Sequence, residues 1–177
     1  MSALLTQEQV RRRCRDAGFG KMAARVASAI AMCEAPGPMV NGVPTSDFSL
    51  VGDQHLANNT WGYSYGGFQV RSLRAHKGTG EYRDEDRLLD VTFNVASAQT
   101  IRREQGWEAW SVYRTGMFKA YLQDLYPPPP NTYVVMAGDT LSSIAAKLGG
   151  FTWEDLARAN GLHTPYTVYI GQHLILP

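Results

Sequence analysis

The sequence has few of the features that mark disulfide-stabilised, membrane-spanning or nucleic-acid-binding proteins. Only two cysteines, Cys14 and Cys33, occur in 177 residues. That is too few for a disulfide framework, so we expect both thiols to be reduced and the core to be held by ordinary packing. No apolar run approaches the roughly 20 residues of a membrane span. Lysine and arginine total 17 against 16 aspartates and glutamates, a formal net charge of +1, which leaves no basic field to attract nucleic acid. We therefore expect neither a membrane span nor a nucleic-acid partner.

Signals for export and for metal binding are also missing. The first residues, MSALLTQEQVRRRCRD, contain no apolar stretch typical of a signal peptide, so we expect synthesis in the cytoplasm without one. The four histidines show no metal-ligand spacing, so we expect no metal ion and no cofactor. An amidase or endopeptidase would need a zinc site or an activated cysteine. Cys33 has no evident histidine partner, and we interpret it as a small core residue.

Four consecutive prolines divide the chain. Pro127 to Pro130 favour an extended polyproline conformation that neither a helix nor a central strand can cross. We predict a first unit at 1–126, a linker at 127–131 and a second unit at 132–177. At about 3.1 Å per residue, such a linker is expected to hold the two units roughly a dozen ångströms apart.

The first unit has mostly helical patterns. Thr6 and Gln9 have the form of a capping box, which predicts a helix at 7–16. Apolar residues at helical spacing predict further helices at 21–34, 86–104 and 107–125. The intervening residues 39–80 are rich in Gly, Asn, Ser and Thr, and we expect long loops there with room for a short hairpin.

The second unit is short, and helix caps and turn residues separate its predicted elements. A strand is predicted at 133–136, helices follow Thr140 and Thr152, and a closing strand is predicted at 173–176. The expected fold is therefore α+β: a mainly α unit followed by a small βααβ unit.

A carboxyl group lies on the apolar face of the second predicted helix. The face runs through Met22, Val26 and Ile30, and the next position four residues on is Glu34. Loss of hydration there would keep the carboxyl protonated near neutral pH, as a general acid that protonates a glycosidic oxygen must be. Periodicity alone leaves a second reading open, in which Glu34 lies in water at the helix end or pairs with an arginine.

A second segment of the first unit resembles a known signature. The residues NNTWGYSYGGFQVRSL contain Ser64, Gly67 and Gln69 and resemble the S-x-G-x-x-Q motif of the soluble lytic transglycosylase and goose-type lysozyme superfamily, which includes phage cell-wall enzymes. The resemblance covers most of residues 20–122. It implies a lysozyme-like domain with Glu34 as the acid. The further cleft residues it implies are Ser64, Gly67, Gln69, Asn94, Trp110 and Tyr113. The chain departs from the family where Ala35 replaces a frequent serine and where the spacer from Glu34 to Gln69 is longer.

The second unit resembles a LysM domain along its whole length. The matching residues are TYVVMAGDTLSSIAAKLGGFTWEDLARANGL and YIGQHLILP. The resemblance implies binding of glycans that contain N-acetylglucosamine, in a groove between two loops. The implied groove residues are Gly138, Asp139, Thr140, Leu141, Asn160, Gly161, Leu162 and Ile170. The alternative is a purely structural role, in which these residues cap a helix and turn the chain. Both roles can be true of the same residues.

The products depend on a second carboxylate. An inverting hydrolase places one about 6.5 to 9.5 Å from the acid to activate water, and Asp53 is preferred to Asp47 for that role. Without it, Glu34 could act first as acid and then as base on the sugar's own 6-hydroxyl, which would leave a 1,6-anhydro end.

The resemblances together predict an enzyme that cleaves the glycosidic bond between the two amino sugars of bacterial peptidoglycan, as a lysozyme or lytic transglycosylase. They imply action at the cell wall by a phage endolysin or a tail-associated lysin, which would add other virion tail proteins as partners. The rival prediction is a non-catalytic, wall-binding virion protein that keeps a lysozyme-like fold.

Overall fold

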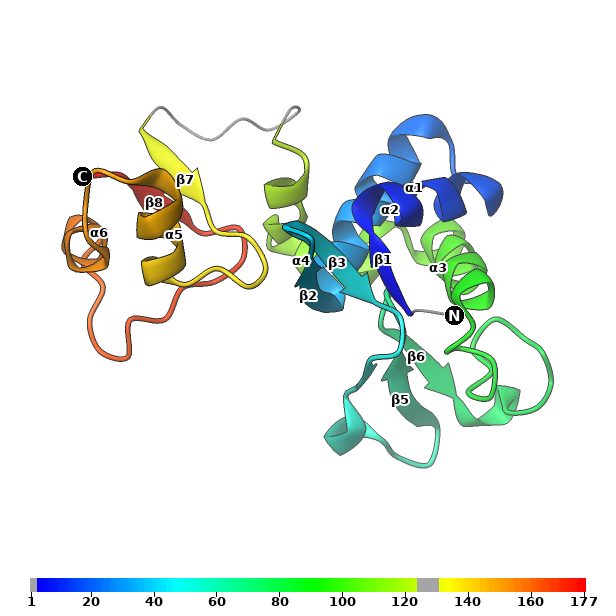
Figure 1. Ribbon diagram of the computed structural model, residues 1–177. Coiled ribbons are helices and arrows are strands. Elements are labelled where there is room, and N and C mark those ends of the chain that lie inside the picture. The colour runs from blue at the N-terminus through cyan, green and yellow to red at the C-terminus, as the bar shows by residue number, and fades with distance from the viewer. Residues whose placement is uncertain (1–2, 124–130) are drawn as a thin grey trace.

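The computed structural model describes residues 3–123 and 131–177 (Figure 1). Of the predicted linker, residues 127–130 lie outside this range. Two hydrophobic cores are present in the described residues, a large one built mainly from residues 10–122 and a small one built from residues of the C-terminal unit. No described helix is both long enough and apolar enough to cross a bilayer.

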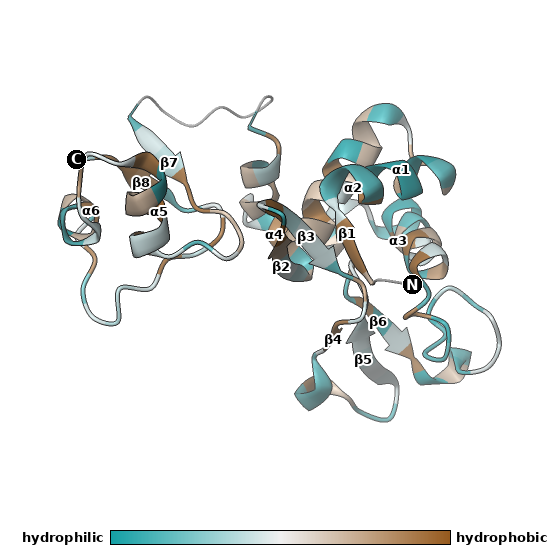
Figure 2. Ribbon diagram, in the orientation of Figure 1, coloured by the Kyte–Doolittle hydropathy of each residue, from teal (hydrophilic) through white to brown (hydrophobic). Residues whose placement is uncertain are grey.

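The first two helices are confirmed. α1 (Gln7–Asp16) begins with the predicted capping box, since the Gln9 backbone N–H donates to Thr6 Oγ1 at 3.4 Å and the Thr6 N–H donates to Gln9 Oε1 at 2.8 Å. α2 (Lys21–Glu34) is largely buried along its second half. In Figure 2, α1 is largely teal because its arginines are hydrophilic. α2 ends at Glu34, just before Pro36, and this places Glu34 at the edge of the core.

The segment after α2 contains more strand than the sequence predicted. β1 (Leu4–Thr6), β2 (Pro36–Val40) and β3 (Val43–Asp47) form one antiparallel sheet in the order β1-β3-β2. β4 (Val51–Gly52), β5 (Trp61–Tyr65) and β6 (Val70–Leu73) form a second, in the order β4-β5-β6. Short 3-10 helices lie at Gln54–Leu56 (η1) and Arg74–His76 (η2). The prediction of long loops was therefore wrong for much of 39–80.

The later helices are shorter than predicted. α3 (Val91–Gln105) begins after Asp90, whose side chain caps it by accepting from the Phe93 N–H at 2.8 Å. Over its described residues, 107–123, the predicted helix at 107–125 is instead three short pieces, η3 (Trp107–Ala109), α4 (Ser111–Arg114) and η4 (Met117–Tyr121). Residues 124 and 125 lie outside the described range. Gly116 has a φ of 78°, a conformation that ends the α4 segment.

The C-terminal unit has the predicted order of elements. β7 (Thr132–Val134) and β8 (His173–Ile175) pair antiparallel, and α5 (Leu141–Leu148) and α6 (Trp153–Ala159) lie between them in the chain. Both helices begin with capping boxes, at Thr140 and Thr152. The α+β class is therefore confirmed.

The two units are in contact. The Ala137 N–H donates to Tyr121 Oη at 3.2 Å, and Val134 and Ala137 belong to the large core of the first unit. A Cβ on Gly171 would lie 3.1 Å from Met117 Cα. The expected separation of a dozen ångströms was therefore wrong, because apolar residues of the second unit pack directly on η4.

Candidate active site

A cleft of about 330 Å³ lies where α2 ends. Its walls come from the second sheet, from the C-terminal half of α3 and from the η3–α4 segment. The lining residues are Glu34, Asp53, Trp61, Ser64, Gln69, Val70, Arg71, Arg83, Ile101, Gln105, Ala109, Trp110, Ser111 and Arg114. Polar groups therefore converge from segments far apart in the sequence, as is typical of a site for a small ligand.

Glu34 is half-buried at the C-terminal end of α2, where the core meets the cleft. Burial is the largest influence on its pKa and raises it, and the nearby charge of Asp53 raises it further. Hydrogen bonds from the Val112 backbone and the Ser111 side chain, and the positive charge of Arg114, act in the opposite direction. The net pKa is above the ordinary glutamate value, so the carboxyl keeps its proton to higher pH than a solvated glutamate would.

Asp53 is the second carboxylate of the cleft. It follows β4 and has a left-handed φ of 53°, a conformation that aspartate tolerates better than most residues. Ser64 Oγ on β5 donates to Asp53 Oδ2 at 2.6 Å. The structure thus brings Glu34, Asp53 and Ser64 to one cavity. Asp47 does not line it, and its carboxylate instead accepts from the Ser49 N–H at 2.8 Å.

Gln69 lies in the turn that closes the β5–β6 hairpin. Its φ is 44°, and its Nε2 donates to the Gly66 carbonyl at 2.9 Å. A Cβ on Gly52 would lie only 2.2 Å from Gln69 Oε1, so the absence of a side chain at Gly52 makes room for the amide. Gln69 is therefore held at the cleft by its own turn and by β4.

Two residues expected to line the cleft instead support this turn from behind. Asn94 is completely buried; its Nδ2 donates to the Tyr65 and Leu88 carbonyls at 2.8 and 3.0 Å, and its Oδ1 accepts from the Phe68 N–H at 3.2 Å. A Cβ on Gly67 would lie 2.3 Å from the Phe48 ring. The small size of Gly67 is thus required by the core, and neither residue lines the cavity.

The aromatic residues divide in a similar way. Trp110 lines the cleft but is only 6% exposed, and its Nε1 donates to the Phe68 carbonyl at 3.0 Å. Tyr113 does not line the cleft and stacks on Phe118, with ring centroids 4.8 Å apart. Trp110 therefore anchors the turn that carries Gln69, and Tyr113 packs against the core.

Four further residues of the cleft, one aromatic and three basic, were not predicted from the sequence. Trp61, Arg71, Arg83 and Arg114 all line it. The motif gave no signal for Arg71, because Gln69 lies in the left-handed turn before β6 and the alternation of a strand does not extend from it to Arg71. Arg83 carried no such signal, because it comes from an irregular segment between η2 and α3.

The expected glycan-binding residues of the C-terminal unit lie in two places. Gly161 and Leu162 line a cavity of about 300 Å³ that also contains Trp153 and Tyr166. Gly138 and Ile170 face the first unit instead, since a Cβ on Gly138 would lie 4.0 Å from Met39 Cγ and Ile170 packs against the large core.

The remaining four stabilise the C-terminal unit itself, three through hydrogen bonds and Leu141 through its burial. Asp139 accepts from the Tyr133 hydroxyl at 2.7 Å, Thr140 caps α5, and Leu141 is 5% exposed. Asn160 joins α6 to β8, because its Nδ2 donates to the carbonyls of Leu156 and Ile175. These bonds fix the loops that the resemblance assigned to the groove.

Both cysteines lie in the core of the first unit. Cys14 and Cys33 are free and buried, and burial raises the pKa of the Cys14 thiol to about 12 and that of Cys33 further. Such thiols are poor nucleophiles. Within 3–123 and 131–177, no three His, Cys, Asp or Glu side chains are grouped so that they could hold a metal ion.

Comparison with known proteins finds a family match in each unit. A family model described as a lysozyme-like domain matches residues 11–112, and a model described as a LysM domain matches residues 133–177. The chain is also 46% identical over 46 residues to a lipoprotein NlpD/LppB homolog of Pseudomonas aeruginosa, a match that covers 26% of this chain and 15% of that protein. No solved structure matches.

The lysozyme-like match spans more than half of the chain. The chain therefore belongs to the lysozyme-like domain family, and it carries a LysM domain after that domain.

Proposed function

We propose that this protein is a glycosidase that cleaves the bond between the amino sugars of peptidoglycan, with Glu34 as the general acid. The observation that carries the proposal is the position of Glu34, half-buried at the end of α2 in a cleft that it shares with Asp53, Ser64 and Gln69. Burial raises its pKa. A protonated carboxyl can therefore donate to the leaving glycosidic oxygen at a pH where ordinary carboxylates are ionised.

Asp53 is the proposed general base, and this makes the reaction a hydrolysis. Its carboxylate lines the same cleft and influences the charge state of Glu34. The hydrogen bond from Ser64 orients one of its oxygens and leaves lone pairs on the other to accept a proton from water. Glu34 thus protonates the leaving oxygen while Asp53 activates the water that attacks the anomeric carbon.

The C-terminal unit is proposed to hold the enzyme on its polymer. In this proposal the catalytic unit is 1–126, the linker is 127–131 and the LysM unit is 132–177. A tether of this kind raises the local concentration of the catalytic unit at the wall, by about 100-fold or more where both units engage. The combination of cleavage and wall binding suits a phage lysin, either an endolysin or a tail-associated enzyme, and the second would add tail proteins as partners.

Mass spectrometry of the products in ¹⁸O-water tests the proposal. Hydrolysis places one ¹⁸O atom at each new reducing end, because the oxygen comes from solvent. Fragments one water lighter, with no label, would show that the 6-hydroxyl attacks instead and that Asp53 is not the base. No cleavage of any glycan would leave only the alternative of a wall-binding protein without activity.

A further inference from the structure

One side of the cleft is strongly basic. Arg71, Arg83 and Arg114 line it, together with only two carboxyl groups, Glu34 and Asp53. In the described part of the chain, no carboxylate lies within 4.0 Å of any of these three guanidinium groups. When Glu34 is protonated for its role as acid, three positive charges therefore face one negative charge.

Arg71 and Arg83 form a compact surface with Trp61, which we name the arginine wall. The guanidinium carbons of Arg71 and Arg83 lie 5.7 and 5.2 Å from the centre of the Trp61 ring system. Arg83 Nη1 donates to the Arg71 carbonyl at 2.8 Å, and Arg83 is only 8% exposed. The two charges are thus stacked on an aromatic face and held in place, which lowers the entropic cost of using them.

The arginine wall keeps unused hydrogen-bonding capacity. Each guanidinium group has five N–H donors. Arg71 donates to the carbonyls of Leu56 and Gly62, and Arg83 donates to that of Arg71. The remaining donors of the half-buried Arg71 suit an anion that enters the cleft, since guanidinium binds carboxylate with paired, charge-assisted bonds.

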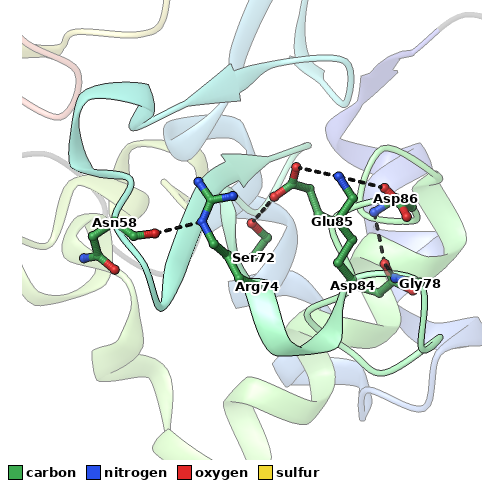
Figure 3. Close-up of polar contacts among 8 residues, drawn as sticks. Asn58, Ser72, Arg74, Gly78, Asp84, Glu85 and Asp86 are labelled. Atoms are coloured by element: carbon green, nitrogen blue, oxygen red, sulfur yellow. Dashed lines mark hydrogen bonds and ion pairs between the residues drawn. The ribbon is translucent and has the colours of Figure 1, made fainter.

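A network of hydrogen bonds holds in place the segment between η2 and α3 that contains Arg83 (Figure 3). Asp84 accepts from the N–H groups of Gly78 and Asp86 at 2.9 and 3.0 Å, and Ser72 donates to Glu85 at 3.2 Å. The Leu73 N–H donates to the Arg83 carbonyl at 3.0 Å. These bonds tie the segment after η2 to β6, so Arg83 is positioned before any ligand arrives.

We propose that the arginine wall is a subsite for a carboxylate carried by the muramic acid residue of the substrate, and that it makes the enzyme selective for charged strands over neutral ones. This inference rests on the proposed glycosidase function. The carboxylate has two possible sources on peptidoglycan. It belongs to the lactyl group of a strand without peptides, or to the stem peptide that is amide-linked to that group.

The test uses strands that differ only in charge. Amidase-stripped glycan strands carry a free lactyl carboxylate, and conversion of this group to a carboxamide gives a neutral strand of the same length. If the lactyl group is the source, wild-type kcat/KM should be about tenfold higher on the charged strand than on the neutral one, the value of one charge-assisted hydrogen bond. If the stem peptide is the source, the tenfold preference should appear on uncrosslinked peptide-bearing strands instead. The preference should shrink in high salt, because the subsite is open to solvent on one side. Uncrosslinked peptide-bearing strands identify the source: a higher kcat/KM than on stripped strands assigns the stem carboxylates, and a lower one assigns the lactyl group.

Arg71→Gln removes the charge and keeps an N–H donor on a shorter side chain. It should lower kcat/KM about tenfold more on the preferred charged strand than on the neutral strand. Arg12→Gln is the matched control, since it makes the same charge change on an exposed position of α1 and should leave the preference intact.

Equal wild-type rates on the neutral strand and on both charged strands, stripped and peptide-bearing, would overturn the inference, as would an equal loss in Arg71→Gln on the neutral strand and on the preferred charged strand. If Arg71→Gln fails to fold, the wild-type preference and its salt dependence still decide. If the wild type cleaves no strand at all, the proposed function itself fails and the subsite with it.

Discussion

Ser64 Oγ donates a 2.6 Å hydrogen bond to Asp53 Oδ2 across the β4–β5 edge of the second sheet. The pair joins a residue of the S-x-G-x-x-Q signature to the carboxylate that the sequence alone offered as a second catalytic group. Because both residues line the cleft that contains Glu34, the signature serine has a definite task in this chain. It orients Asp53.

Asp53→Asn should lower kcat by at least about 100-fold, because the amide cannot take the proton of the attacking water. The measurement is turnover of soluble glycan strands, with products counted by mass spectrometry. Asp47→Asn is the matched control, since that carboxylate caps its own turn outside the cleft. A near-normal rate in Asp53→Asn would remove Asp53 from the mechanism and leave Glu34 to act alone.

Arg114→Gln should move the alkaline limb of the pH profile of kcat/KM to higher pH. The enzyme needs Glu34 protonated, so activity falls as the pH rises through its pKa. Arg114 lowers that pKa, and its removal therefore raises the pKa and widens the active range. The effect should weaken in high salt, because Arg114 is exposed. A shift to lower pH would contradict the assignment of Glu34 as the titrating acid.

Asn94→Ala should destabilise the fold by about 2 to 3 kcal/mol, because it removes three buried hydrogen bonds, to two backbone carbonyls and one backbone N–H. Denaturant unfolding measures the loss of stability. KM of the folded fraction should stay close to the wild-type value, since Asn94 does not line the cleft. A large rise in KM with normal stability would instead restore its predicted role as a substrate ligand.

Removal of residues 132–177 should reduce action on intact walls about 100-fold more than turnover of soluble strands, because the tether acts only on the polymer. The shortened protein should also unfold at a lower temperature, since Tyr121 and Met117 lose their contacts with Ala137 and Gly171. Rates are therefore compared per folded molecule. Equal losses on both substrates would contradict a tethering role.

Helices were predicted well where the sequence carried both a capping signal and a clear helical periodicity. The capping box of Thr6 and Gln9 located α1, and helical periodicity led to Glu34 at the end of α2. Most strands between residues 36 and 73 were missed, although Asn41 and Gly42, both with positive φ, join β2 to β3. An Asn-Gly pair is a strong hairpin signal, but the polar composition of the surrounding residues favoured a prediction of loops.

Site residues were predictable where a motif or a helical stripe carried them, as for Glu34 and Gln69. The arginine wall was not, because Arg83 reaches the cleft only through the tertiary bonds of an irregular segment. Asn94 and Trp110 were recognised as important, but their burial could not be read from the sequence. Both support the turn of Gln69 from behind.

The most direct test of the central claim compares wild type and Glu34→Gln on purified soluble glycan strands. Burial raises the pKa of Glu34, so its ionised form destabilises the native state once the pH rises above that pKa, and the neutral amide should fold at least as well there. The account predicts that Glu34→Gln unfolds at no lower temperature than the wild type and loses at least about 100-fold in kcat. A folded Glu34→Gln protein that cleaves the strands at the wild-type rate would contradict it.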